Sequence, residues 1–157
     1  CGALLEHFGL CADDEDEDKY AAVCDYVFNC LSEGGYCPED TGREDGVVGR
    51  FRIECRGFDC WVFVCPAEGI AHITIPVGNE FGYEFGKEAR AAFSLMAHNT
   101  DVTVCRSEPD EDGHERFYFS ETLMLSDDKE KFLSDFKSYL EDLERCMDFF
   151  IEQVRQQ

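Results

Sequence analysis

Ten cysteines are the residues of this chain with the widest chemical range, because a thiolate can bind a metal or attack a substrate. They occupy positions 1, 11, 24, 30, 37, 55, 60, 65, 105 and 146. None forms a C-x-x-C pair, and none joins a histidine at zinc-ligand spacing. Several, such as Cys24 and Cys146 on predicted helices, stand where an apolar residue is expected. This pattern favours reduced thiols in a cytoplasmic protein, and a disulfide framework in an exported protein is the alternative.

Histidines and carboxylates do not add a catalytic pattern. The histidines His7, His72, His98 and His114 lie on four different predicted elements, and none is paired with a cysteine, serine or carboxylate at triad spacing. The chain has 35 acidic residues, so some carboxylates fall within catalytic reach of each other by chance alone. We therefore predict that the protein is not an enzyme and that it has no catalytic residues, metal or cofactor.

The charge of the chain excludes several partners. Lysine and arginine number 14, which leaves a formal net charge of −21. Such a surface repels nucleic acid and anionic lipid, whose binding needs a basic patch. No apolar run approaches the roughly 20 residues of a spanning helix, so no integral membrane segment is expected. The acidic residues either attract a basic partner or keep the protein soluble.

Periodicity predicts an α+β fold with the order α-β-β-β-α-β-β-α, in which helices pack on an antiparallel sheet and the last helix is long. Residues 1–18 form an acidic N-terminal segment and residues 19–157 a single domain. The predicted elements are a helix at Lys19–Glu33, a loop at Tyr36–Gly46, a three-stranded meander at Val47–Val77, a helix at Lys87–Asn99, strands at Val102–Arg106 and Glu115–Leu125, and a helix capped by Ser126.

The meander carries the candidate binding site, because its alternation divides it into two faces. The predicted core face contains Phe51, Ile53, Cys55, Cys60, Val62, Val64, Ala71, Ile73 and Ile75. The predicted second face contains Arg50, Arg52, Glu54, Arg56, Trp61, Phe63, Cys65, Ile70, His72 and Thr74. A solvated face does not normally carry tryptophan, phenylalanine and isoleucine together. We select Trp61, Phe63, Ile70, His72 and Arg52 as partner-binding residues. The alternative is that another part of the same chain covers this face.

The order of elements from Lys19 to Val154 resembles the type III secretion chaperone-like superfold, including the YbjN-like family of small bacterial proteins. The closest local similarity is at Ala91–Phe149, where a helix ending in Met96-Ala97-His98-Asn99 precedes a strand, a turn, a longer strand and a helix with an acidic start. The resemblance implies homodimers built partly on the second helix, with Ala91, Leu95 and His98 at the interface. It also implies binding of other polypeptides along apolar grooves.

Two hypotheses follow. The first is a non-enzymatic, chaperone-like or regulatory protein-binding module, a homodimer that contacts a protein or peptide client through sheet and helix surfaces. The second is a structural or envelope-associated protein, lipid-anchored through Cys1, with a disulfide tested first between Cys55 and Cys60. Cys1-Gly2 fits the start of a mature lipoprotein, and a trimmed chain explains it equally well.

Overall fold

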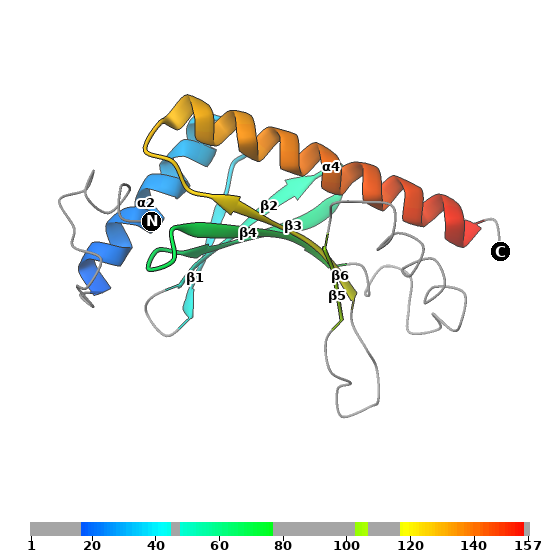
Figure 1. Cartoon of the computed structure of the whole chain (residues 1–157), viewed down its shortest axis with the longest axis horizontal. Helices are drawn as coiled ribbons and strands as arrows, with labels where there is room; N and C mark the ends of the chain where they lie inside the picture. Colours follow the sequence, from blue (N-terminus) through cyan, green and yellow to red (C-terminus); the bar gives the residue numbers. More distant parts are fainter. Residues whose placement is uncertain (1–16, 45–47, 77–102, 107–116, 156–157) are drawn as a thin grey trace. The chain divides into compact units, whose positions relative to one another are not determined.

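The structure is a computed structural model, and it describes residues 17–44, 48–76, 103–106 and 117–155 (Figure 1). The elements are α2 (Glu17–Glu33), β1 (Glu39–Glu44), β2 (Val48–Cys55), β3 (Phe58–Cys65), β4 (Ile70–Pro76), β5 (Thr103–Arg106), β6 (Phe117–Met124) and α4 (Lys129–Arg155). The strands form one sheet in the order β1-β2-β3-β4-β6-β5. The α+β class and the predicted element order are confirmed, apart from one added strand and the segment predicted as a helix at Lys87–Asn99, which lies outside the described residues.

The added strand, β1, lies in the segment predicted as a loop. Its sequence, EDTGRE, has no apolar alternation and contains Gly42, so nothing in it indicates a strand. Pairing with β2 makes it extended: Glu39 lies opposite Arg52 and Glu44 opposite Val48, in antiparallel register with an irregularity between Asp40 and Arg43. A short, charged and irregular edge strand is one way in which proteins discourage sheet-to-sheet association. The loop prediction was therefore wrong.

The β2–β3 turn fixes the register of the meander. Arg56 and Gly57 are its two loop residues, and both have positive φ, 52° and 85°. Positive φ at both central positions is the mark of a type I′ turn, whose twist matches that of the paired strands. The turn pairs Cys55 with Phe58 and Ile53 with Cys60. The hairpin predicted from sequence is confirmed, with Phe58 and Asp59 belonging to β3 rather than to the turn.

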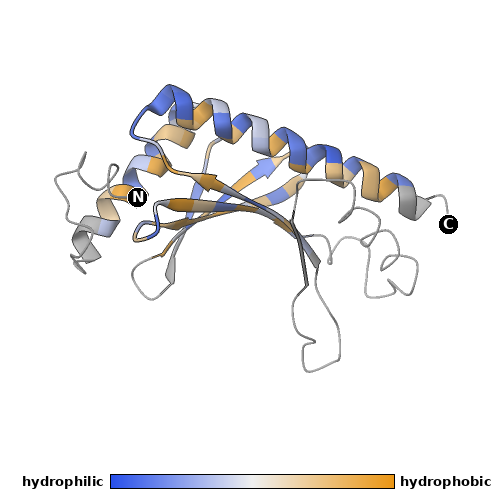
Figure 2. Cartoon of the chain, in the orientation of Figure 1, coloured by the Kyte–Doolittle hydropathy of each residue, from blue (hydrophilic) through white to orange (hydrophobic). Residues whose placement is uncertain are grey.

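Contacts divide the chain into two compact units. Unit 1 comprises the chain up to Ile73 together with Thr122–Ser138, and unit 2 comprises Thr74–Glu121 together with Tyr139–Gln157. In unit 2, Phe119 of β6 packs edge-on against Phe150 of α4, with ring centroids 6.0 Å apart. The buried residues of this half of α4 are Leu140, Leu143, Cys146, Met147 and Phe150. Hydrophilic and hydrophobic residues alternate in bands along α4, as expected for an amphipathic helix (Figure 2).

In unit 1, α2 buries its apolar stripe against β2. The stripe consists of Tyr20, Val23, Cys24, Val27, Cys30 and Leu31, all of which are buried. Phe28 packs edge-on against Phe51 of β2, with ring centroids 5.4 Å apart. The first half of α4 adds Phe136, whose ring lies 4.9 Å from that of Tyr36 in the connection after α2. These contacts fix the segment that leads from α2 into β1.

Gly49 of β2 lies in close contact with Cys24 of α2. A methyl group on Gly49 would lie 2.8 Å from Cys24 Sγ and 3.2 Å from Cys24 Cβ. We expect Gly49→Ala to lower the free energy of unfolding by about 1–3 kcal/mol, because the site is already filled. Urea denaturation measures the loss. A free energy of unfolding equal to that of the wild-type protein would contradict the close approach at Gly49.

The N-cap of α4 differs from the predicted one. Asp128 Oδ1 accepts hydrogen bonds from the backbone N–H groups of Glu130 and Lys131, at 3.0 and 3.2 Å. The carbonyl of Asp128 accepts the first helical bond, from Phe132 N–H at 2.9 Å. Ser126 instead accepts from Asp128 N–H at 3.1 Å and shapes the turn before the helix. Asp128, not Ser126, is therefore the N-cap. Serine and aspartate are both suitable N-cap residues, but the helix begins directly after Asp128, two residues beyond Ser126.

Removing this cap should weaken α4. We expect Asp128→Ala to lower the free energy of unfolding by about 1 kcal/mol, the usual loss for an N-cap carboxylate. Asp128→Asn keeps an acceptor oxygen at the same place and should retain most of the stability. Thermal and urea denaturation of the two variants compare them directly, and equal losses would rule out a capping role.

Candidate functional site

The candidate site is the face of unit 1 that points away from α2, and Cys65 at the end of β3 belongs to this face together with Trp61 and Phe63. Strands β2, β3 and β4 alternate between buried and more exposed residues along their whole length. The predicted core residues Phe51, Ile53, Cys60, Val62, Val64, Ala71, Ile73 and Ile75 are all buried, whereas Cys55 at the end of β2 is only half-buried. We call the opposite side the outer face; in unit 1 it consists of Glu39, Thr41, Arg50, Arg52, Glu54, Asp59, Trp61, Phe63, Cys65, Ile70, His72, Thr122 and Met124.

Two stacked aromatic rings form the centre of the outer face. Trp61 and Phe63, two residues apart on β3, have ring centroids 6.4 Å apart at an interplanar angle of 19°. The guanidinium carbon of Arg50 lies 5.9 Å from the Trp61 ring centroid, within cation–π range. Arg50 is held there by Thr41, because its Nε donates to Thr41 Oγ1 at 3.0 Å and its Nη2 to the Thr41 carbonyl at 3.2 Å. Both aromatic side chains remain half-buried, so an apolar surface stays accessible.

Arg52 bridges two carboxylates beside Trp61. Its Nε and Nη2 both donate to Glu39 Oε2, the former at 3.1 Å, and its Nη1 lies 3.8 Å from Asp59 Oδ1. The hydrogen bond to Glu39, followed by the charges of Glu39 and Asp59, raises the pKa of Arg52. The Arg52 side chain is 44% exposed, so these pairs contribute little to stability. They instead hold the three side chains beside one another on the outer face.

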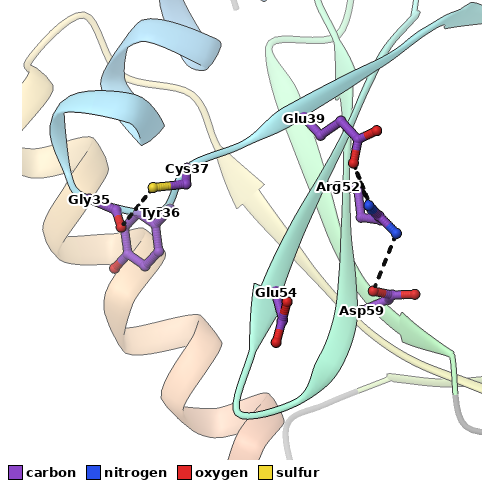
Figure 3. Close-up of a pocket in the computed structure, with 7 residues that line it drawn as sticks. All are labelled: Gly35, Tyr36, Cys37, Glu39, Arg52, Glu54 and Asp59. Carbon is purple, nitrogen blue, oxygen red and sulfur yellow. Dashed lines mark hydrogen bonds and ion pairs between the residues drawn. The ribbon is translucent and has the colours of Figure 1, made fainter.

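A cavity of about 380 Å³ adjoins Arg52 (Figure 3). Gly35, Tyr36, Cys37, Glu39, Arg52, Glu54 and Asp59 line it. It forms because β1 begins at Glu39, opposite Arg52, and so does not extend alongside Glu54. The connection from α2 closes its other side, where Cys37 takes the left-handed conformation (φ 50°) and its thiol lies 3.9 Å from the Gly35 carbonyl. The cavity is therefore a notch at the sheet edge with three carboxylates and one guanidinium.

The far side of the outer face is formed by β4 and β6. His72 Nδ1 lies 3.0 Å from Thr122 Oγ1, and Ile70 is half-buried beside them. Met124 is 59% exposed, and it is the large apolar side chain most open to solvent in the described part of the chain. An exposed methionine is typical of surfaces that accept varied apolar partners. Apolar surface therefore continues from the aromatic pair on β3 toward β6.

The structure brings all five predicted partner-binding residues onto one face. Trp61, Phe63 and Arg52 are neighbours on β2 and β3, with Arg52 directly opposite Trp61, and Ile70 and His72 follow on β4. The predicted dimer residues Ala91, Leu95 and His98 lie outside the described residues. Sequence reasoning missed Glu39 and Thr41, since β1 gives no strand signal. It placed Arg50 on this face without selecting it, although its position opposite Phe63 was readable from the alternation.

The thiols that the structure describes range from buried to exposed: Cys24, Cys30, Cys60 and Cys146 are buried, Cys55 and Cys65 are half-buried, and Cys37 is exposed. Cys24, Cys30, Cys37, Cys55, Cys60, Cys65 and Cys146 are thiols and not half of a disulfide. Burial raises the pKa of Cys30, and burial together with Glu68 raises the pKa of Cys65. Both thiols are therefore poorer nucleophiles at neutral pH than an ordinary cysteine.

Across residues 17–44, 48–76, 103–106 and 117–155, no group of three or more histidine, cysteine or acidic side chains is placed to hold a metal ion. Within those ranges, neither helix combines the length and the apolar character that crossing a membrane requires.

Comparisons of the chain with protein-family models, with curated proteins and with solved structures each gave no match. The resemblance to the type III secretion chaperone-like superfold thus stays a prediction from the sequence, and function is argued from the outer face.

Proposed function

We propose that this chain is a non-enzymatic protein-binding module that holds a polypeptide segment of a partner protein against the outer face of unit 1. The observation that carries the proposal is the accessible Trp61–Phe63 pair, flanked by Arg50 and continued by Met124. Tryptophan, arginine and methionine are enriched in the centres of protein interfaces.

The hydrogen bonds and ion pairs of these side chains support the same function. Arg50 is held by Thr41, and Arg52 is held by Glu39 and Asp59. Side chains that are already ordered lose little conformational entropy when a partner binds, which favours affinity. The surrounding charged residues are exposed to solvent, as is usual at the rim of an interface.

The proposal retains a chaperone-like homodimer, as the resemblance implies, with Ala91, Leu95 and His98 as interface residues. Light scattering at several protein concentrations tests this part separately, since a mass of one chain at all concentrations would contradict it. A cytoplasmic location is proposed with it, and the seven thiols named above support a reducing compartment. An acyl adduct on Cys1 in the native protein, seen by intact mass, would instead favour the lipid-anchored alternative.

A library of short immobilised peptides tests the binding function. We expect the labelled protein to bind a subset of peptides rich in aromatic or aliphatic residues and to leave uniformly polar peptides unbound. The same screen with Tyr139→Ala provides a control for aromatic truncation elsewhere, since Tyr139 is a half-buried residue of α4. A wild-type protein that binds no peptide in the library would contradict the proposal.

A further inference from the structure

We propose that the bound segment carries a lysine or arginine that enters the cavity beside Arg52, two residues away from the apolar side chain that lies on Trp61. This inference rests on the proposed function and specifies the chemistry of the partner. It treats the cavity and the aromatic pair as two halves of one recognition surface.

The charges lining the cavity are unequal. Glu39, Glu54 and Asp59 contribute three carboxylates, and Arg52 contributes the single cation. Arg52 engages one oxygen of Glu39 and lies 3.8 Å from Asp59, and the charge of Glu54 also acts on Arg52 and raises its pKa, so one guanidinium faces three carboxylates. All three carboxylates are exposed, so they attract a cation without a large loss of hydration. The cavity therefore favours a basic side chain over an acidic one.

The other arginine of the surface does not reverse this preference. The Arg50 guanidinium donates twice to Thr41 and lies over Trp61, and Arg50 is not part of the cavity wall. The chain as a whole carries −21 charges, so its field also draws basic segments and repels acidic ones. The charges that line the cavity and the net charge of the whole chain thus both favour a basic partner segment.

Strand geometry gives the spacing. Asp59 and Trp61 are i and i+2 on β3, and Arg52 lies directly opposite Trp61. Residues i and i+2 of a strand are about 7 Å apart on one face. A peptide that runs alongside β3 in an extended conformation has the same repeat. When its apolar side chain lies on Trp61, the side chain two positions along the peptide lies at the cavity. The expected pattern is an apolar residue, any residue, and then lysine or arginine, in one of the two chain directions.

Four end-capped peptides of otherwise identical glycine and serine composition test this pattern. The first carries phenylalanine and, two residues later, arginine; the second replaces that arginine with glutamine; the third moves it to the adjacent position; the fourth reverses the order of the first. The first and fourth peptides present the same pattern in the two chain directions. We expect whichever of them binds better to bind about three- to five-fold more tightly than the second and third peptides, which is within the effect of an exposed ion pair. This preference should shrink as salt rises.

Two variants of the protein locate the effect. Glu54→Gln should reduce the preference for arginine over glutamine, because it removes one cavity carboxylate. Glu68→Gln makes the same charge change in the β3–β4 turn, outside the cavity, and should leave the preference unchanged. Equal binding of the arginine and glutamine peptides would overturn the inference while the proposed function stands. No binding of any peptide, including those selected by the library, would overturn both.

Discussion

Trp61→Ala should weaken the binding of a library-selected peptide by about 30-fold or more, which corresponds to the roughly 2 kcal/mol typical of an interface hot spot. Trp61 is the largest accessible apolar group at the centre of the outer face, and its loss also removes the ring beneath Arg50 and beside Phe63. Phe63→Ala should have a smaller effect of the same kind. Fluorescence anisotropy of a labelled peptide measures both.

The fold should survive these changes, because both rings are half-buried and neither belongs to the core beneath α2. Circular dichroism and urea denaturation provide that control. Trp61→Phe retains an aromatic ring and should keep most of the affinity. If Trp61→Ala bound the peptide as well as the wild-type protein while remaining folded, the outer face would not be the binding site.

Phe136→Ala should lower the free energy of unfolding by about 3–5 kcal/mol, the cost of truncating a fully buried phenylalanine. Phe136 is 0% exposed, packs edge-on against Tyr36 at 4.9 Å and lies 6.1 Å from the ring of Phe132. Its removal leaves a cavity under the connection that leads from α2 into β1. Since whole domains have only about 5–15 kcal/mol of stability, the loss should be visible as a much lower urea midpoint.

Two further substitutions make the result specific. Phe136→Leu keeps most of the volume and should cost less than about 1.5 kcal/mol. Lys137→Ala changes the next residue, which is exposed, and should stay within about 0.5 kcal/mol of the wild-type protein. A loss at Lys137 as large as that at Phe136 would contradict the packing described for unit 1.

Burial and turn chemistry made the centre of the fold readable from the sequence. The alternation in β2, β3 and β4 places Phe51 and Val62 in the core and Trp61 on the outer face without reference to any other element. Arg56-Gly57 marks the turn that fixes this register. The apolar spacing along α2 likewise predicts its buried stripe. In each case the local pattern and the tertiary contacts favour the same structure.

The elements that the sequence did not predict depend on contacts between distant residues. β1 has a polar sequence and is a strand because Glu39 and Thr41 meet Arg52 and Arg50 of β2. The cavity exists because β1 begins where it does, so its lining could not be assembled from spacing alone. The cap of α4 was misplaced because Ser126 and Asp128 are both good caps and only the path of the backbone distinguishes them.

The emission of Trp61 during titration with a library-selected peptide reports most directly on binding at the outer face. The chain contains one tryptophan, so the signal comes from the outer face alone. We predict a saturable shift of the emission maximum to shorter wavelength, with the same dissociation constant as anisotropy, because the peptide removes water from the ring. Binding detected by anisotropy with an unchanged Trp61 spectrum would contradict the claim that a polypeptide binds on this face.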